Sequence, residues 1–206
     1  MAISEKTTTT RREEIVNACE KLYKTMSFRE ITLKEISEET SFSRPSIYNY
    51  FATKEEIFLA LFEREYDRWN DSLEEIHRGK RSLSGHALAE KLAKSLAERP
   101  QLLKLLSMNL YDMEANSRLE CLTRFKHSYG KAMENVRRLL LKFRPDMTGG
   151  QIRDFIYAFF PFMFGIYPYT AVTEKQRTAM GEAGIDYVYQ TVYELTYSCL
   201  TRLLGE

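Results

Sequence analysis

Residues 32–54 read TLKEISEETSFSRPSIYNYFATK, and this stretch decides how we interpret the whole chain. Leu33 and Ile36 have the spacing of one short helix, and Ile47 and Phe51 have the spacing of a second. The Ser-Phe-Ser sequence between them has the length of the turn in a helix-turn-helix, whose second helix enters the major groove of DNA. The stretch therefore predicts a helix-turn-helix.

The second predicted helix, of about eight residues from Arg44, would present polar side chains outward. A helix of that length spans about 12 Å, close to the width of the major groove. If Ile47 and Phe51 face the core, the polar side chains of this helix face outward. Arg can then bind guanine and Asn can bind adenine, while the Ser and Tyr hydroxyls can reach phosphates or base edges. Ser43 would cap this helix, and Pro45 would occupy its first turn. The residues that we expect to contact double-stranded DNA are Thr32, Ser43, Arg44, Pro45, Ser46, Tyr48, Asn49, Tyr50 and Lys54.

Charge alone does not distinguish a DNA-binding surface from an ordinary solvated surface with a few tyrosines. The chain has 30 Lys plus Arg and 29 Asp plus Glu, a net charge of +1, and residues 1–52 hold eight basic and eight acidic residues. A positive face must therefore arise by arrangement, with acids such as Glu38 and Glu39 turned away from the DNA. Lys54 would add a cation where the start of the next helix already attracts phosphate.

Length and composition indicate a globular chain that can fold without disulfide bonds. With 206 residues and 44% hydrophobic content, the chain can bury a sizeable core. Its three cysteines, Cys19, Cys121 and Cys199, indicate neither a disulfide framework nor a zinc site, and we expect no metal and no cofactor. The first ten residues, MAISEKTTTT, lack the apolar region of a secretory signal, so we expect a cytoplasmic protein.

Start signals for helices recur along the chain. Ser or Thr followed three residues later by Glu or Gln, the capping-box pattern, precedes helix-period apolar residues six times. Together with glycine and proline separators, this pattern predicts a first helix after Thr10, a fourth from Thr53 to about His77, and no strand. Further helices are predicted near residues 86–98, 101–113, 118–144, 151–168 and 174–204. The predicted fold is all-α, with about nine helices.

The run ITLKEISEETSFSRPSIYNYFATKEEIF, preceded by RREEIVNACEKLYKTM, resembles the N-terminal domain of TetR-family transcriptional regulators over residues 10–62. Its most specific parts are IYNYFATKEE and the Ser-Arg-Pro-Ser helix start. Ser41 departs from the glycine that is usual in the turn, and a slight tilt of the second helix is the expected consequence. The resemblance implies a helix-turn-helix DNA-binding domain in residues 1–52. It also implies a helical domain in residues 53–206 that binds a small ligand and forms a homodimer.

Residues 155–169, FIYAFFPFMFGIYPY, are apolar on nearly every face of a helix, which must therefore be buried on most of them. Pro161 should kink that helix. The uncharged run 155–173 has nearly the length of a membrane span, but its two prolines and aromatic composition favour a buried helix, so we expect no membrane association.

An aromatic stripe of this kind is often plain core, and the functional alternative is that one face lines a pocket for a small apolar or aromatic effector. The side chains that we expect to line this pocket are Phe62, Tyr66, Trp69, Met108, Tyr111, Phe125, Tyr129, Phe159, Phe162, Met163 and Tyr167.

The last predicted helix carries an apolar face that either packs within its own chain or pairs with a second copy. A twofold dimer suits DNA, because two recognition helices about 34–36 Å apart read successive major grooves. With the 151–168 helix, the last helix could form an isologous four-helix interface. The expected interface residues are Ile152, Phe155, Ile156, Val188, Val192, Leu195, Cys199 and Leu203.

Two other classes of function stay open at this point. Glu74 and His77 have the E-x-x-H spacing of a di-iron site, which would make an α-helical metal or small-molecule enzyme, although a second such motif is missing. A helical scaffold that binds only proteins is the other class. We favour a non-enzymatic regulator: a repressor that binds a palindromic operator as a homodimer and is released by its effector.

Overall fold

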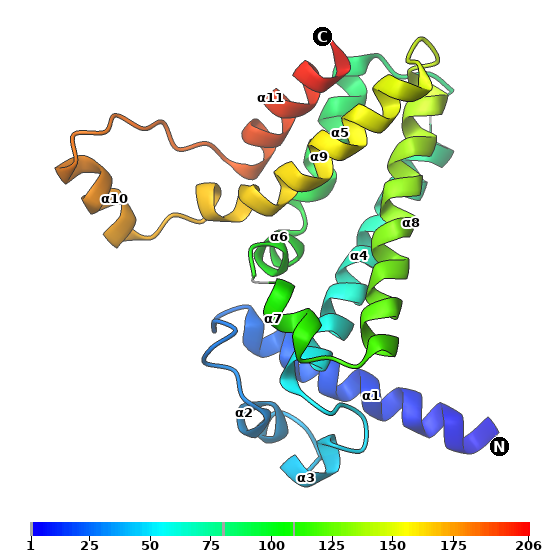
Figure 1. The fold of residues 1–206 in the computed structure, drawn as a ribbon, viewed down its shortest axis with the longest axis vertical. Helices are drawn as coiled ribbons and strands as arrows, with labels where there is room; N and C mark the ends of the chain where they lie inside the picture. Colours follow the sequence, from blue (N-terminus) through cyan, green and yellow to red (C-terminus); the bar gives the residue numbers. More distant parts are fainter. Residues whose placement is uncertain (1, 80, 109) are drawn as a thin grey trace. The chain divides into compact units, whose positions relative to one another are not determined.

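The computed structural model describes residues 2–79, 81–108 and 110–206, apart from the side chains of residues 2–9. Every regular element in this part of the chain is an α-helix, which confirms the all-α prediction (Figure 1). The helices are α1 (Ala2–Tyr23), α2 (Leu33–Glu38), α3 (Arg44–Ile47), α4 (Lys54–Arg78), α5 (Gly85–Ala97), α6 (Pro100–Leu106), α7 (Leu110–Ala115), α8 (Leu119–Phe143), α9 (Gly149–Thr170), α10 (Glu174–Glu182) and α11 (Val192–Leu204).

Several predicted helix starts are confirmed by their hydrogen bonds. Thr32 and Thr148 form complete capping boxes at the starts of α2 and α9. The Thr173 hydroxyl accepts from the backbone N–H of Gln176 at 3.2 Å and caps α10. The expected start after Thr10 is wrong, because α1 already begins at Ala2.

The single helix predicted over residues 174–204 is also wrong, because α10 and α11 are separated by an irregular segment. Gly184 follows α10 with φ = 68°, a left-handed conformation that glycine adopts at little cost and that ends a helix. A separate capping box starts α11, in which the Thr191 N–H donates to the Glu194 carboxylate at 2.8 Å. Likewise, the segment predicted as 101–113 contains two helices, α6 and α7.

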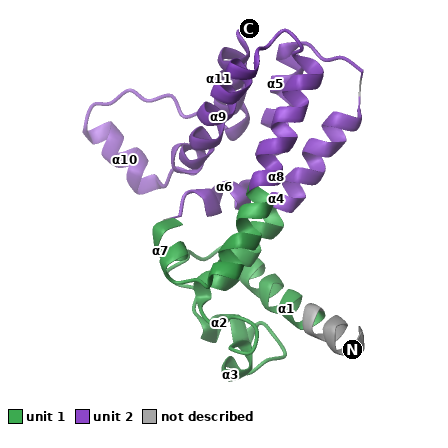
Figure 2. Ribbon diagram, turned by 45° about the vertical axis from the view of Figure 1, so that its right-hand side comes forward, with its two compact units in different colours: residues 1–65, 109–129 green, residues 66–108, 130–206 purple. Residues whose placement is uncertain are grey.

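The chain forms two compact units (Figure 2). Unit 1 consists of residues 1–65 and 109–129, and unit 2 consists of residues 66–108 and 130–206. Consequently, α4 and α8 each begin in unit 1 and end in unit 2. The core of unit 1 is built where α1, α2, α3 and the start of α4 bury apolar side chains, and Tyr23 packs edge-on against Phe58 with 5.1 Å between ring centroids.

Unit 2 packs α11 against α5 and α9, and α6 against α9. Its core contains Trp69, whose indole N–H donates to the hydroxyl of Ser95 at 3.0 Å, with the ring of Phe160 6.0 Å away. Pro161 lies inside α9, which nevertheless continues as one helix to Thr170. The aromatic segment is a core helix along one face only, so the prediction that it is buried on most of its faces is wrong: Tyr157 and Tyr169 are 66% and 57% exposed.

Among the described residues, no single helix is long and apolar enough to cross a bilayer. By length and composition, α9 and α10 would reach that threshold only as a pair, and they meet at 85°.

Candidate functional site

The helix-turn-helix predicted from residues 32–54 lies in unit 1, and two buried side chains hold it against the core of that unit. Ile47 and Phe51 are fully buried, as predicted. The regular part of α3 is shorter than expected and ends at Ile47. Beyond it, the N–H groups of Tyr50 and Phe51 both donate to the Ile47 carbonyl, at 2.9 and 3.1 Å. These bonds keep residues 48–51 coiled, so the polar side chains still have a defined direction.

The turn between α2 and α3 does not require the glycine that Ser41 replaces. No non-glycine residue in the described part of the chain has a positive φ, so Ser41 adopts an ordinary backbone conformation. The carboxylate of Glu14 accepts a hydrogen bond from the Ser41 N–H at 2.7 Å, which lowers the pKa of Glu14. This bond fixes the turn to α1. Because Ser41 needs no unusual backbone conformation, the backbone gives no reason for the expected tilt of the second helix.

The surface of α3 and the turn after it is polar and open. Arg44, Pro45, Tyr48 and Asn49 are exposed, with half of the Tyr48 side chain accessible. Among the described residues, Arg44 makes no ion pair, so its guanidinium is available to an outside acceptor.

Four other predicted DNA contacts are partly used within the protein. The hydroxyls of Ser43 and Ser46 hydrogen-bond to each other at 2.9 Å, and Ser43 makes no side-chain cap on α3, contrary to the prediction. Tyr50 is half-buried against Phe42, with 5.9 Å between ring centroids. Thr32 caps α2 and accepts from the N–H of Lys34 at 3.1 Å.

Acidic residues near the turn are paired with lysines. Glu39 lies 2.5 Å from the ammonium of Lys21, and Glu38 lies 3.8 Å from that of Lys34. These pairs reduce the negative potential that the acids would otherwise impose on the surface.

Lys54 is held inside unit 1. Its ammonium donates to the carbonyl oxygen of Phe28 at 2.7 Å and lies 4.0 Å from the centroid of the Phe28 ring. Burial lowers the pKa of Lys54. A phosphate contact by Lys54 stays a prediction, and this residue also ties the loop before α2 to the start of α4.

The main feature that the sequence did not predict is an ion pair in unit 1 between Glu56, whose carboxylate is buried, and Arg118, whose side chain is half exposed. The Glu56 carboxylate accepts from the N–H of Ala52 at 2.8 Å and from the guanidinium of Arg118 at 2.7 Å. Burial opposes ionisation of Glu56, but these hydrogen bonds outweigh it and lower its pKa to about 2. Thr53 and Glu56 fit the capping-box pattern, but that pattern accounts for only one bond of Glu56, from its N–H to the Thr53 hydroxyl at 3.2 Å.

The predicted effector-binding side chains fall into two groups, one in each unit. In unit 1, Phe62 and Phe125 are buried and stacked with 4.7 Å between centroids, Tyr129 is half-buried, and Tyr111 is 84% exposed. In unit 2 the side chains are buried or half-buried, and they are Tyr66, Trp69, Met108, Phe159, Phe162, Met163 and Tyr167. Their common pocket stays a prediction.

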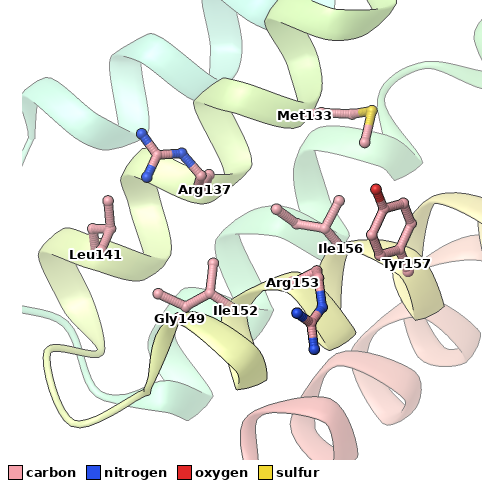
Figure 3. Close-up of a pocket in the computed structure, with 8 residues that line it drawn as sticks. All are labelled: Met133, Arg137, Leu141, Gly149, Ile152, Arg153, Ile156 and Tyr157. Carbon is pink, nitrogen blue, oxygen red and sulfur yellow. The ribbon is translucent and has the colours of Figure 1, made fainter.

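In the described part of unit 2, a cavity between α8 and α9 and another between α4 and α5 are both lined without any predicted effector residue. The first, of about 230 Å³, is a groove between α8 and α9 (Figure 3). Its lining consists of Met133, Arg137, Leu141, Gly149, Ile152, Arg153, Ile156 and Tyr157. The second, of about 260 Å³, lies between α4 and α5 and is more polar, with Lys91, Lys94, Glu75 and Glu98 in its lining.

The predicted dimer residues also divide by exposure. On α9, Ile152, Phe155 and Ile156 are buried within their own chain. The α11 residues Val192, Leu195, Cys199 and Leu203 are half-buried, and Val188 is 79% exposed. Because the helical period is 3.6 residues, burying Phe155 turns the neighbouring positions Tyr157, Ala158 and Pro161 outward.

Comparison with known families decides what kind of protein carries this helix-turn-helix. Residues 15–61 match the model of bacterial regulatory proteins of the tetR family, and residues 63–197 match that of the tetracyclin repressor-like C-terminal domain. The chain belongs to the TetR family of transcriptional regulators. It is therefore a DNA-binding regulator rather than an enzyme, and the resemblance found in the sequence is confirmed.

Individual relatives are more distant. An uncharacterized HTH-type transcriptional regulator of Bacillus subtilis, YfiR, is 37% identical over 57 residues, which span 28% of this chain and 28% of that protein. The structure of FadR from Bacillus subtilis in complex with stearoyl-CoA has a TM-score of 0.61 at 16% identity, covering 94% of this chain and 97% of FadR. Thermus thermophilus FadR in complex with lauroyl-CoA has a TM-score of 0.58 at 19% identity, covering 95% and 94%. At these identities, the structural similarity establishes the fold alone.

The alternative of a metal enzyme at Glu74 and His77 has no support in the side-chain contacts. The carboxylate of Glu74 pairs with Lys131 at 3.0 Å. Over the described residues, no three His, Cys, Asp or Glu side chains are grouped so that they could hold a metal ion.

Proposed function

We propose that the protein is a homodimeric repressor that binds a palindromic operator through α3 and the turn after it. The observation that carries this proposal is the arrangement around α3: buried Ile47 and Phe51 hold the segment, while Arg44, Tyr48 and Asn49 are exposed and polar. A rigid helix that presents such side chains is suited to the major groove. We assign DNA binding to residues 1–52, and effector binding and dimerisation to residues 53–206.

The exposed side chains have distinct proposed roles. Arg44 and Asn49 read base edges, because a guanidinium pairs with guanine O6 and N7 and an amide with adenine N6 and N7. Tyr48 and Ser46 reach phosphates or base edges, whereas Thr32, Ser43, Pro45, Tyr50 and Lys54 orient the segment and contact the backbone of the duplex.

Selection of bound duplexes from a random pool tests this proposal. The expected product is a palindrome whose half-sites are centred about 10 base pairs apart or a multiple of this, because the two heads of a twofold dimer read successive major grooves. A single unrepeated half-site would contradict the dimer. Binding that does not fall with salt would contradict phosphate contacts altogether.

The proposed effector is an apolar small molecule that binds the helical domain and weakens DNA binding. Support comes from the aromatic interior of unit 2, where Trp69, Phe159 and Met163 are buried, since methionine adapts readily to apolar ligands. The structurally similar FadR proteins were crystallised with acyl-CoA esters, so an acyl thioester is our first candidate.

The effector must bind the conformation that cannot bind DNA more tightly than the conformation that can. Equal affinity for both conformations would not shift the equilibrium between them. Helix α4 begins at Lys54 in unit 1 and continues into unit 2, so we propose that it connects effector binding to DNA binding.

The effector class is tested by measuring thermal shift and operator release with acyl-CoA esters of increasing chain length, with free CoA as the control. Stabilisation and release that both grow with chain length support the acyl class. If a tightly bound ester leaves operator affinity unchanged, this effector class is excluded.

A further inference from the structure

Residues 171–191, which we call the arm, leave the surface of unit 2 without packing on it. The arm comprises α10 and the irregular segment up to α11, and Figures 1 and 2 show it extending away from α9 and α11. No residue of α10 is buried, and within the arm only Val172, Met180 and Tyr189 are even partly covered.

Contacts within the arm nevertheless give it a defined shape. The Arg177 guanidinium lies 4.2 Å from the centroid of the Tyr189 ring, and Tyr187 packs edge-on against Tyr189 at 5.0 Å. The N–H of Ile185 donates to the carbonyl of Met180 at 3.0 Å. A helix of nine residues is unstable in water without packing, so an arm with this shape needs a surface to lie on.

The tip of the arm is apolar and acidic. Ile185 is 50% exposed, Val188 is 79% exposed, and Tyr187 also faces solvent. Residues 182–188 include Glu182 and Asp186 and no basic residue. A surface that covers this tip must therefore be apolar and carry positive charge.

The groove between α8 and α9 has these properties. Its lining is apolar apart from two arginines, and Leu141 and Tyr157 within it are 49% and 66% exposed. Arg137 is held by two hydrogen bonds to Glu134, at 2.7 and 2.8 Å. Among the described residues, Arg153 pairs only with its neighbour Asp154, at 3.3 Å, and it belongs to the lining of the groove (Figure 3).

We propose that in the homodimer the arm of each copy lies in the α8–α9 groove of the other copy. Ile185 and Val188 contact the apolar lining, and Asp186 faces Arg153. The inference rests on the dimer of the proposed function and adds to it an interface formed by exchanged arms. A second copy is the occupant because the groove and the arm are both apolar and both uncovered in the same chain, and the lining has two arginines and no acidic residue where the tip has Glu182 and Asp186 and no basic one.

The position of the arm along α9 favours exchange over a contact within one chain. Helix α9 has 22 residues and is about 33 Å long. The groove lies along its first half, whereas the arm begins after its last residue, Thr170. A twofold axis perpendicular to the middle of α9 pairs the end of one α9 with the start of the other, which brings each arm to the partner's groove.

Cross-linking between two differently tagged, co-expressed chains tests the exchange. Both carry Cys199→Ser, since Cys199 is half-buried whereas Cys19 and Cys121 are buried. One chain carries Val188→Cys and the other Tyr157→Cys, and a short bis-maleimide is added. The expected product is a covalent dimer that contains both tags. The matched control replaces Tyr157→Cys with Lys91→Cys, in the other cavity of unit 2, and should give no such product.

The outcomes separate the inference from the proposed function. A dimer in sedimentation equilibrium that does not cross-link between positions 188 and 157 overturns the arm exchange and leaves the repressor dimer standing. A monomer at all concentrations overturns both.

A charge swap gives an independent measurement. Asp186→Arg and Arg153→Asp should each raise the dimer Kd about threefold, a typical effect for an exposed ion pair, and the double variant should return it close to the original value. Glu174→Arg, at the start of α10, is the control and should leave the Kd unchanged. Additive losses in the double variant would show that the two residues do not face each other.

Discussion

The segment around α3 and the arm are both exposed, but they differ in what holds them. Two fully buried side chains, Ile47 and Phe51, anchor α3 and its following turn in unit 1. The arm has no buried residue and depends on contacts among its own side chains. The comparison teaches that exposure alone does not mark a functional surface. The α3 segment is ready to bind because its own core orients it, whereas the arm needs a partner to complete it.

The largest effect should come from removing the anchor of α3. Phe51→Ala should lower the free energy of unfolding by about 3–5 kcal/mol, because it leaves a cavity in a packed core. Urea denaturation measures the change. The exposed neighbour Tyr48→Ala is the control and should change stability by less than about 0.5 kcal/mol. If both variants are equally stable, α3 is not held as we describe.

A smaller loss of stability is expected from breaking the Glu56–Arg118 ion pair. Glu56→Gln should lower the free energy of unfolding by about 2–3 kcal/mol. This loss is below the range for fully buried ion pairs because Arg118 is half exposed. Glu120→Gln is the matched control, since Glu120 contacts the same arginine at 3.5 Å from an exposed position. Its substitution should cost less than about 0.5 kcal/mol.

The same ion pair predicts a pH dependence. The pKa of Glu56 is about 2 in the folded protein against an ordinary value of 4.5. Its contribution to stability is therefore complete above about pH 4.5 and is lost as the pH falls from there towards 2. Urea denaturation at several pH values should show a smaller acid loss in Glu56→Gln than in the unmodified protein. Parallel curves would mean that another carboxyl group causes the acid loss.

Arg44→Ala tests whether the exposed face of α3 recognises a DNA sequence. It should weaken binding to the selected operator by about 1–3 kcal/mol and relax the preference at one base position. Competition assays on operator and random duplexes measure both effects. Equal losses on the two duplexes would make Arg44 a phosphate contact only.

The smallest effect on DNA binding is expected at Lys54. Lys54→Ala should weaken all duplexes alike and reduce the salt dependence of binding by about one phosphate contact. Because the Lys54 ammonium also binds the Phe28 carbonyl, stability must be measured in parallel. A loss of stability with unchanged DNA affinity would assign Lys54 to the fold alone.

How far the sequence predicted the structure depended on the range of the interactions. Helix starts at Thr32 and Thr148 were found correctly, because a capping box involves residues only three apart. The break between α10 and α11 was missed, although the Thr191 and Glu194 pattern was visible, because an apolar face appeared to continue across it. The Glu56–Arg118 pair joins residues 62 positions apart, and no local pattern reveals such a contact.

By itself, the sequence determined the class of the protein, since helical periodicity, a three-residue turn and the polar residues after Ser43 are local features that together specify a helix-turn-helix of the TetR family. Only the tertiary structure decided which apolar side chains are core and which remain open. Phe155 and Tyr157 are two positions apart on one aromatic helix, yet one is buried and the other lines an open groove. The reason is that burial depends on which helices pack on each face, and that packing joins residues distant in the chain.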